Sequence, residues 1–274
     1  MTHPDLAQRR AAFRDLHREG CFILPNPWDP GSAKWLAQAG FKALASTSSG
    51  YAFSRGHADG DIGVDEVLAH LRELVDATDL PVNADFESGH ARDLEGLAAN
   101  VRRCVDTGVA GLSIEDSTGD KDHPLYDYDE AVARMRAARK AIDESGADVM
   151  LVGRSEGFLV GRPDLDETLR RLEAYAEAGA DCLYAPGLST REQIAAVVKA
   201  VAPKPVNVLM GPAAKLGFDT LGELGVRRVS VGGALALAAW GGFATAANRL
   251  AEGSFDGFAG SLTHAQLNAA FAKP

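Results

Sequence analysis

PVNADFESGH (81–90) decides the fold, because a short apolar segment runs directly into acidic residues. The same order returns in GLSIEDS (111–117) and in VMLVGRSEG (149–157), with helical sequence between them. Short apolar strands that alternate with helices indicate a parallel sheet buried on both faces. This alternation continues outward from the three segments toward both ends of the chain.

Eight strand candidates share this short, apolar character: 21–25, 43–47, 81–85, 111–115, 149–154, 182–186, 205–210 and 227–232. Helical patterns follow them at 31–40, 64–78, 92–107, 127–145, 164–179, 189–201, 213–224 and 233–252. Eight such units in 274 residues predict one (β/α)₈ TIM-barrel domain over 1–274. A doubly wound sheet is the alternative, but no GxGxxG turn follows the first strand.

Two further helices are expected outside the eight units. Residues 4–19 predict a helix that plugs the N-terminal end of the barrel, and 261–272 predict an extra helix beyond it. The small residues of GGALALAAWGGFATAA (232–247) predict a helix for close packing, interrupted at the Trp-Gly-Gly of 240–242.

Composition narrows the class of protein. The chain has 28 basic and 38 acidic residues, a net charge of −10, which disfavours nucleic acid and anionic membranes as partners. The three cysteines are far apart and form no CxxC pattern, so neither a disulfide framework nor a zinc site is predicted. The N-terminus lacks the apolar region of a secretory signal, and we expect a cytoplasmic protein.

Barrel enzymes carry their reacting groups at the C-terminal ends of the strands. The candidate residues at those positions are Asn26, Trp28, Asp29, Thr47, Ser48, Ser49, Gly50, Asn83, Asp85, Glu87, Glu115, Asp116, Arg154, Glu156, Tyr184, Asn207 and Ser230. The ends of the third and fourth strands, which are adjacent, carry four carboxylates that would repel one another: Asp85, Glu87, Glu115 and Asp116. A divalent cation relieves that repulsion, and oxygen ligands suit Mg²⁺ or Mn²⁺. The alternative is a rim of ion pairs in which Arg154 neutralises its acidic neighbours.

Several motifs occur in an order typical of one superfamily: NPWDPGSAKWLAQAGFKALASTSSG (26–50), ADGDIG (58–63), VNADFESGH (82–90), GLSIEDS (111–117) and GRSEGF (153–158). With them, the chain from roughly Pro25 to Gly232 resembles the isocitrate lyase/phosphoenolpyruvate mutase superfamily. That resemblance implies a metal-bound enolate of pyruvate or a near relative. It also implies a tetramer in which the helix after strand 8 is swapped between subunits.

The resemblance assigns roles to individual residues. Asp85 would ligate the metal with Glu115 in the same shell, and Asp59 would lie beside the substrate. The substrate carboxylate would be cradled by Ser48, Ser49 and Gly50 and paired with Arg154, while Trp28 would wall the pocket. From their positions at strand ends, Glu87 joins the expected metal ligands and Asn207 the expected substrate contacts.

The chain departs from the superfamily pattern in the loop after strand 4. Isocitrate and methylisocitrate lyases carry a catalytic cysteine there, whereas this loop reads STGDKDHPLYD (117–127). Lys121 and His123 are therefore the candidates for catalytic groups in a closing lid. Asn83 also stands where a second aspartate is usual, which weakens the negative shell around the metal.

The leading hypothesis is a Mg²⁺-dependent lyase for a C–C bond of a small 2-oxo or 2-hydroxy dicarboxylic acid. One alternative is a P–C bond enzyme of the phosphoenolpyruvate mutase, phosphonopyruvate hydrolase or carboxyphosphonoenolpyruvate mutase type. Another is an oxo-acid binder without turnover. A sugar-phosphate barrel using Gly211-Pro212 and Gly232-Gly233 ranks last.

Overall fold

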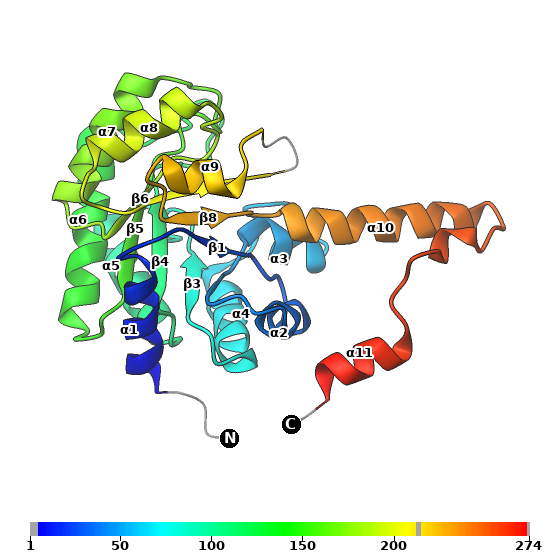
Figure 1. Ribbon diagram of the computed structural model, residues 1–274. Coiled ribbons are helices and arrows are strands. Elements are labelled where there is room, and N and C mark those ends of the chain that lie inside the picture. The colour runs from blue at the N-terminus through cyan, green and yellow to red at the C-terminus, as the bar shows by residue number, and fades with distance from the viewer. Residues whose placement is uncertain (1–4, 212–214, 273–274) are drawn as a thin grey trace.

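A barrel of eight parallel strands forms the body of the protein, in a computed structural model that describes residues 5–211 and 215–272 (Figure 1). The strands are β1 (Phe22–Leu24), β2 (Leu44–Ala45), β3 (Val82–Asp85), β4 (Gly111–Glu115), β5 (Met150–Arg154), β6 (Cys182–Tyr184), β7 (Val206–Leu209) and β8 (Arg228–Ser230). From β2 to β8 each strand pairs with the next along the chain, and β1 pairs with β8. The barrel closes between β1 and β2, where the Ala45 N–H donates to the Pro25 carbonyl at 3.0 Å. The predicted TIM barrel is confirmed.

Helices follow the strands in the predicted order. They are α1 (Leu6–Leu16), α2 (Pro30–Gln38), α3 (Ser48–Ser54), α4 (Val64–Ala77), α5 (Leu94–Val105), α6 (Tyr128–Glu144), α7 (Leu165–Glu177), α8 (Arg191–Ala200), α9 (Phe218–Glu223), α10 (Ala234–Ala251), the 3₁₀ turn η1 (Asp256–Phe258) and α11 (His264–Phe271). Helix α3 was not expected, since no helix was predicted between 43–47 and 64–78. The helix predicted over 213–224 is shorter, and its first two positions lie outside the described residues.

Helix α1 covers the N-terminal end of the barrel, as predicted. Its Phe13 side chain is fully buried in a cluster with inward-facing strand residues such as Leu24 and Met150. Next to it, the His17 ring packs edge-on against Phe13 at 4.7 Å between ring centroids. Helix α1 therefore closes the N-terminal end of the barrel interior, and the C-terminal ends of the strands form its open end.

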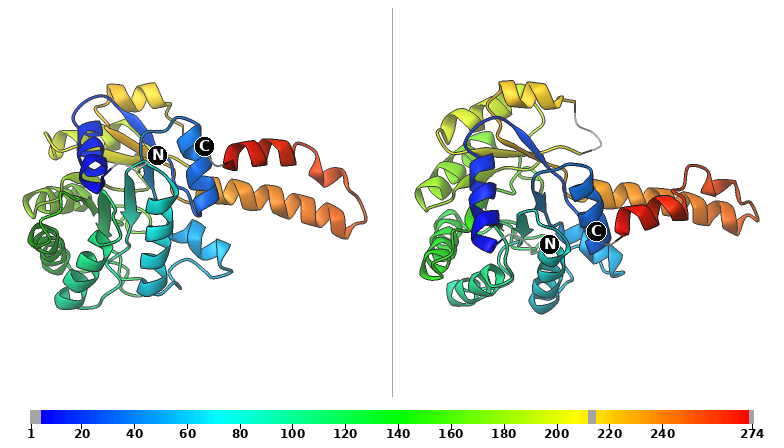
Figure 2. Two further views of the ribbon diagram at one scale, coloured as in Figure 1. Left: turned by 90° about the horizontal axis from the view of Figure 1, so that it is seen from below. Right: turned by 60° about the horizontal axis from the view of Figure 1, so that its bottom comes forward.

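Helix α10 leaves the barrel instead of packing on it (Figures 1 and 2). It runs unbroken from Ala234 to Ala251, so the predicted interruption at 240–242 is wrong. Glycine costs a helix about 1 kcal/mol per residue, which the surrounding alanines and leucines outweigh. Ala236 is the one buried side chain that α10 contributes among the described residues. Helix α11 returns toward α2, where Gln38 Nε2 donates to the Ala270 carbonyl.

Among the described residues, none of the helices combines the length and the apolar character of a bilayer crossing.

Candidate active site

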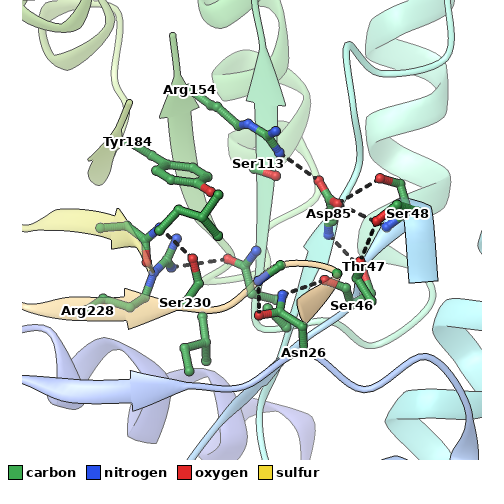
Figure 3. Close-up of a pocket in the computed structure, with 18 of the residues that line it drawn as sticks. Asn26, Ser46, Thr47, Ser48, Asp85, Ser113, Arg154, Tyr184, Arg228 and Ser230 are labelled. Carbon is green, nitrogen blue, oxygen red and sulfur yellow. Dashed lines mark hydrogen bonds and ion pairs between the residues drawn. The ribbon is translucent and has the colours of Figure 1, made fainter. Parts of the chain in front are cut away.

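A cavity of about 200 Å³ opens at the C-terminal ends of the strands (Figure 3). Its described lining residues are Leu24, Asn26, Ala45, Ser46, Thr47, Ser48, Ser49, Asp59, Asn83, Asp85, Ser113, Arg154, Leu159, Tyr184, Asn207, Leu209, Arg228, Ser230, Gly232 and Gly233. All eight strands, or the segments directly after them, contribute; β4 does so through Ser113, whereas Glu115 at its end is not among the described lining residues. This is the end of the barrel where TIM-barrel enzymes bind their substrates.

Asp85 is the most connected carboxylate at the mouth. It ends β3, and its Oδ2 accepts hydrogen bonds from the backbone N–H and the hydroxyl of Ser48, both at 3.0 Å. Its Oδ1 lies 3.1 Å from Arg154 Nη1. Ser48 is held in place because it begins α3, which Thr47 caps by accepting the Gly50 N–H at 3.2 Å. The unexpected helix thus positions the serines of the predicted substrate cradle.

Arg154 connects the acidic groups of three strand ends. Besides Asp85, its Nη1 lies 3.3 Å from Glu115 Oε2, and its Nε donates to Glu156. The guanidinium also stands 5.1 Å from the centre of the Tyr184 ring. A single cation therefore compensates three partly buried carboxylates, and the mouth keeps an excess of negative charge.

Burial and the excess of negative charge raise the pKa values of carboxyl groups at the mouth. Burial raises the pKa of Glu115 well above its usual range, with Glu156 and Asp85 adding to the rise, while Arg154 opposes it. Burial and the neighbouring Asp85 also raise the pKa of Asp59, although the residue as a whole is exposed. A cation bound at the mouth would favour the ionised form of these groups.

The residues present fit a divalent ion with few protein ligands. No group of three His, Cys, Asp or Glu side chains in the described ranges forms a ready-made metal site. Asp85 and Glu115 nevertheless approach the same Arg154 nitrogen, so both carboxylates face one small volume. Mg²⁺ typically takes one or two carboxylates and completes its shell with water and substrate oxygens. The donor set is therefore suitable for Mg²⁺ or Mn²⁺.

Glu87 is not among the described residues that line the main cavity, and its place among the metal ligands stays a prediction. It lines a smaller cavity with Tyr51 and His70, and its Oε2 lies 3.9 Å from His90 Nδ1. Burial and the Asp85 charge raise the pKa of Glu87 to about 7. Glu87 and His90 have φ of 47° and 51°, a left-handed backbone that is costly outside glycine. The smaller cavity that Glu87 lines also includes Asp85.

Trp28 and Gly50 also lie outside the main cavity. Trp28 lines a separate hollow with Trp240 and Phe243 at the base of α10. A Cβ on Gly50 would stand 2.6 Å from Thr47 Cγ2 and 3.2 Å from Trp28 Cβ, so this glycine permits close packing of α3. Of the predicted cradle, Ser48 and Ser49 line the cavity and Gly50 does not; Trp28, predicted as a wall of the pocket, is also not among the described lining residues.

Lys121 and His123 do not reach the cavity either. Both are exposed in the loop after β4, whose ends are joined by a bridge between Ser117 and Leu125. Thr118 Oγ1 donates to the His123 carbonyl within this loop. The His123 side chain instead borders a second, open hollow of about 550 Å³ between the loop and α7. The catalytic role predicted for these two residues remains a proposal that requires the loop to move.

Asp116 points away from the mouth, contrary to the four-carboxylate cluster expected from the sequence. Its Oδ2 accepts from the Tyr175 hydroxyl at 2.6 Å and from Arg171 Nη1 at 3.1 Å, and its Oδ1 accepts the Glu156 N–H at 2.7 Å. These bonds saturate a carboxylate that is 3% exposed. The strand-end position does not determine which side of the barrel wall the side chain faces.

Polar residues also form the floor of the cavity. Asn207 accepts from Arg228 Nε at 2.8 Å through Oδ1 and donates to Ser230 Oγ at 2.9 Å through Nδ2. The sequence interpretation placed Asn207 and Ser230 here but missed Arg228, together with Ser46 and Ser113. A signal was available, since strand side chains alternate and an inward Ser230 implies an inward Arg228.

The protein is a TIM barrel with a small polar cavity at the carboxyl ends of its strands, which is where TIM-barrel enzymes have their active sites. Residues 13–251 match the family model described as phosphoenolpyruvate phosphomutase. The chain therefore belongs to this family, within the isocitrate lyase/phosphoenolpyruvate mutase superfamily that its motifs resemble.

Three relatives illustrate the range of the superfamily. A crystal structure of a Burkholderia cenocepacia J2315 protein, named a lyase/mutase without a stated substrate, is 47% identical with a TM-score of 0.95 and covers 98% of this chain and 99% of its own. Oxaloacetate decarboxylase of Paraburkholderia xenovorans is 29% identical over 81% of this chain and 74% of its own. The structure of a 2,3-dimethylmalate lyase is 25% identical, with a TM-score of 0.84 over 97% and 94%. Relatives named as lyases and mutases support an enzyme.

Proposed function

We propose that the protein is a Mg²⁺- or Mn²⁺-dependent lyase that cleaves a C–C bond of a small 2-oxo or 2-hydroxy dicarboxylic acid. The observation that carries this proposal is the convergence of Asp85 and Glu115 on one nitrogen of Arg154 at the barrel mouth. The relative named oxaloacetate decarboxylase, 29% identical, adds support for C–C chemistry.

Asp85 and Glu115 would hold the ion, which when bound would act as a Lewis acid toward the negative charge of a pyruvate-type enolate. Arg154 adds fixed positive potential beside the same substrate oxygens. Ser49 and the hydroxyl of Ser48 would orient the substrate carboxylate. Burial raises the pKa of Tyr184 to about 12, so its hydroxyl keeps its proton at neutral pH and can donate a hydrogen bond into the cavity.

The P–C bond enzymes are the second candidate, favoured by the description of the matching family model. Purified protein with Mg²⁺ should be assayed against oxaloacetate, methylisocitrate and phosphonopyruvate. Turnover of a carbon acid supports the C–C lyase, and turnover of phosphonopyruvate alone supports the second candidate. Tight binding of oxo-acids with no product would identify a binder without catalysis.

The metal site is tested by removing its carboxylates. We expect Asp85→Ala and Glu115→Ala to lower Mg²⁺ and oxalate affinity in calorimetry by about 100-fold or more, because each deletes a charged ligand. Asp129→Ala, at an exposed carboxylate in the first turn of α6, is the matched control and should bind as the unaltered protein does. Full affinity in both site variants would contradict the proposal.

A further inference from the structure

Arg228 lies at the floor of the cavity because the strands of the barrel are tilted. Neighbouring strands pair Glu115 with Arg154, Arg154 with Tyr184, Tyr184 with Asn207, and Asn207 with Arg228. This row starts at the last residue of β4 and ends at the first residue of β8. Because barrel strands are tilted and staggered, the row descends from the mouth to the floor. Arg154 and Arg228 therefore mark the two ends of one cavity.

Arg228 has hydrogen-bond partners but no counter-charge. It is 2% exposed, and its Nε donates to Asn207 Oδ1 at 2.8 Å. Its Nη1 lies 3.5 Å from Asn83 Oδ1 and 3.4 Å from His17 Nε2. Burial and the charge of Arg228 lower the pKa of His17 to about 3, so this imidazole is neutral. Every contact that the described residues make with the guanidinium is thus to a neutral group.

A buried guanidinium without an anion is energetically costly, and arginine cannot relieve that cost by losing its proton. No described residue offers an acceptor to Arg228 Nη2, although Arg228 lines the cavity together with Asn83 and Ser113 (Figure 3). The planar fork of a guanidinium matches a carboxylate. The missing partner is therefore an anion that enters from the cavity.

We infer that Arg228 binds a carboxylate of the substrate at the floor of the cavity and so determines specificity for dicarboxylic acids. The inference rests on the proposed function, in which Asp85, Glu115 and Arg154 act on the other end of the same molecule. A cavity of about 200 Å³ has room for one small acid held between these two ends.

Two stable ligands test the inference in the unaltered protein. Racemic malate and racemic 2-hydroxybutanoate share the 2-hydroxy acid group and differ in whether the far end is a carboxylate or a methyl group. In calorimetry with Mg²⁺ we expect malate to bind about 10- to 100-fold more tightly, the range that a hydrogen-bonded charge contributes. Equal affinities would overturn the role of Arg228 and leave the proposed function standing. Absence of binding by both ligands would overturn the inference together with the proposed function.

Two substitutions locate the preference. Arg228→Gln removes the cation, and Asn83→Asp supplies a counter-charge 3.5 Å from Nη1 with almost no change of shape. Both should reduce the preference for malate to about twofold or less while 2-hydroxybutanoate binds as before, since a paired or absent cation leaves nothing for the second carboxylate. Arg227→Gln is the matched control, because that side chain points outward to the Gly20 carbonyl.

The two variants also separate specificity from a structural role. If Arg228→Gln fails to fold, Asn83→Asp decides the question, because it keeps the arginine and its packing. A malate preference that survives in Asn83→Asp would overturn the inference. So would an equal loss of both ligands in a variant that unfolds at the temperature of the unaltered protein.

Discussion

At the residue scale, buried groups without partners are the most informative feature of this protein. His70 stacks on the Tyr51 ring at 3.7 Å between centroids, and neither ring nitrogen has a hydrogen-bond partner among the described residues. Burial lowers the pKa of His70 to about 4, which keeps the imidazole neutral. In the small cavity that His70 and Asp85 both line, the His70 side chain of α4 therefore carries no charge, although the acidic mouth lies next to it.

We expect the neutral His70 to make folding sensitive to acid. The unfolded chain takes up a proton near pH 6.5, whereas the folded protein does so only near pH 4. Its contribution to the free energy of unfolding is complete above pH 6.5 and falls by about 1.4 kcal/mol per pH unit as the pH drops to 4. His70→Phe should remove that part of the slope in urea unfolding at several pH values. An unchanged slope, or the same loss in the exposed-site control His264→Phe, would contradict the assignment.

At the scale of elements, Asp116 joins three of them. It follows β4, accepts from Arg171 and Tyr175 of α7, and holds the Glu156 N–H just after β5. Arg171 also donates to the Tyr126 carbonyl at 3.1 Å, at the far end of the loop after β4. The network therefore anchors the base of that loop and the segment that carries Glu156 against Arg154.

Asp116→Ala should be strongly destabilising, because Arg171 Nη1, the Tyr175 hydroxyl and the Glu156 N–H all lose their buried acceptor, and Arg171 keeps only Glu167 as an acidic partner. Removal of one partner of a buried ion pair costs about 3–5 kcal/mol, and the free energy of unfolding in urea measures it. Asp166→Ala, at an exposed position in the first turn of α7, should cost about 0.5 kcal/mol or less. A similar small loss at Asp116 would show that the network carries no net stability.

At the scale of the whole molecule, α10 and α11 form an arm with an apolar surface. Leu237 is 53% exposed, Phe243 62% and Phe255 73%. Ile23 on the outer face of β1 is 37% exposed, which shows that the place of an eighth covering helix is left open. Exposed apolar groups of this size mark surfaces for association. The arm and the open face together favour the helix-swapped oligomer that the superfamily resemblance implies.

We accordingly expect a tetramer at micromolar concentration in light scattering coupled to gel filtration. The double change Leu237→Glu with Phe243→Glu should yield smaller species, because it places two charges in the proposed interface. Lys199→Glu on the exposed side of α8 introduces the same acidic residue away from the arm and should leave the mass unchanged. A monomer in the unaltered protein would contradict this arrangement.

Much of the fold and part of the site follow from local sequence. Alternating apolar strands and helices determine the eight units, and the acidic residues that follow β3 and β4 identify the mouth, because both signals lie within a few neighbouring residues. The positions of Asp85, Glu115, Arg154 and the serines of α3 were predictable for that reason. Helix α3 itself was not, since its seven residues depend on the Thr47 cap and on packing against Trp28.

The sequence by itself determined that this chain is a barrel of its superfamily with a carboxylate-rich mouth, since strand ends and motif order are read along the chain. Only the tertiary structure decided that Asp116 turns outward, that α10 departs and that Arg228 lies beneath the mouth without a counter-charge. Those outcomes depend on strand tilt and on contacts between residues far apart in sequence, which no local pattern encodes.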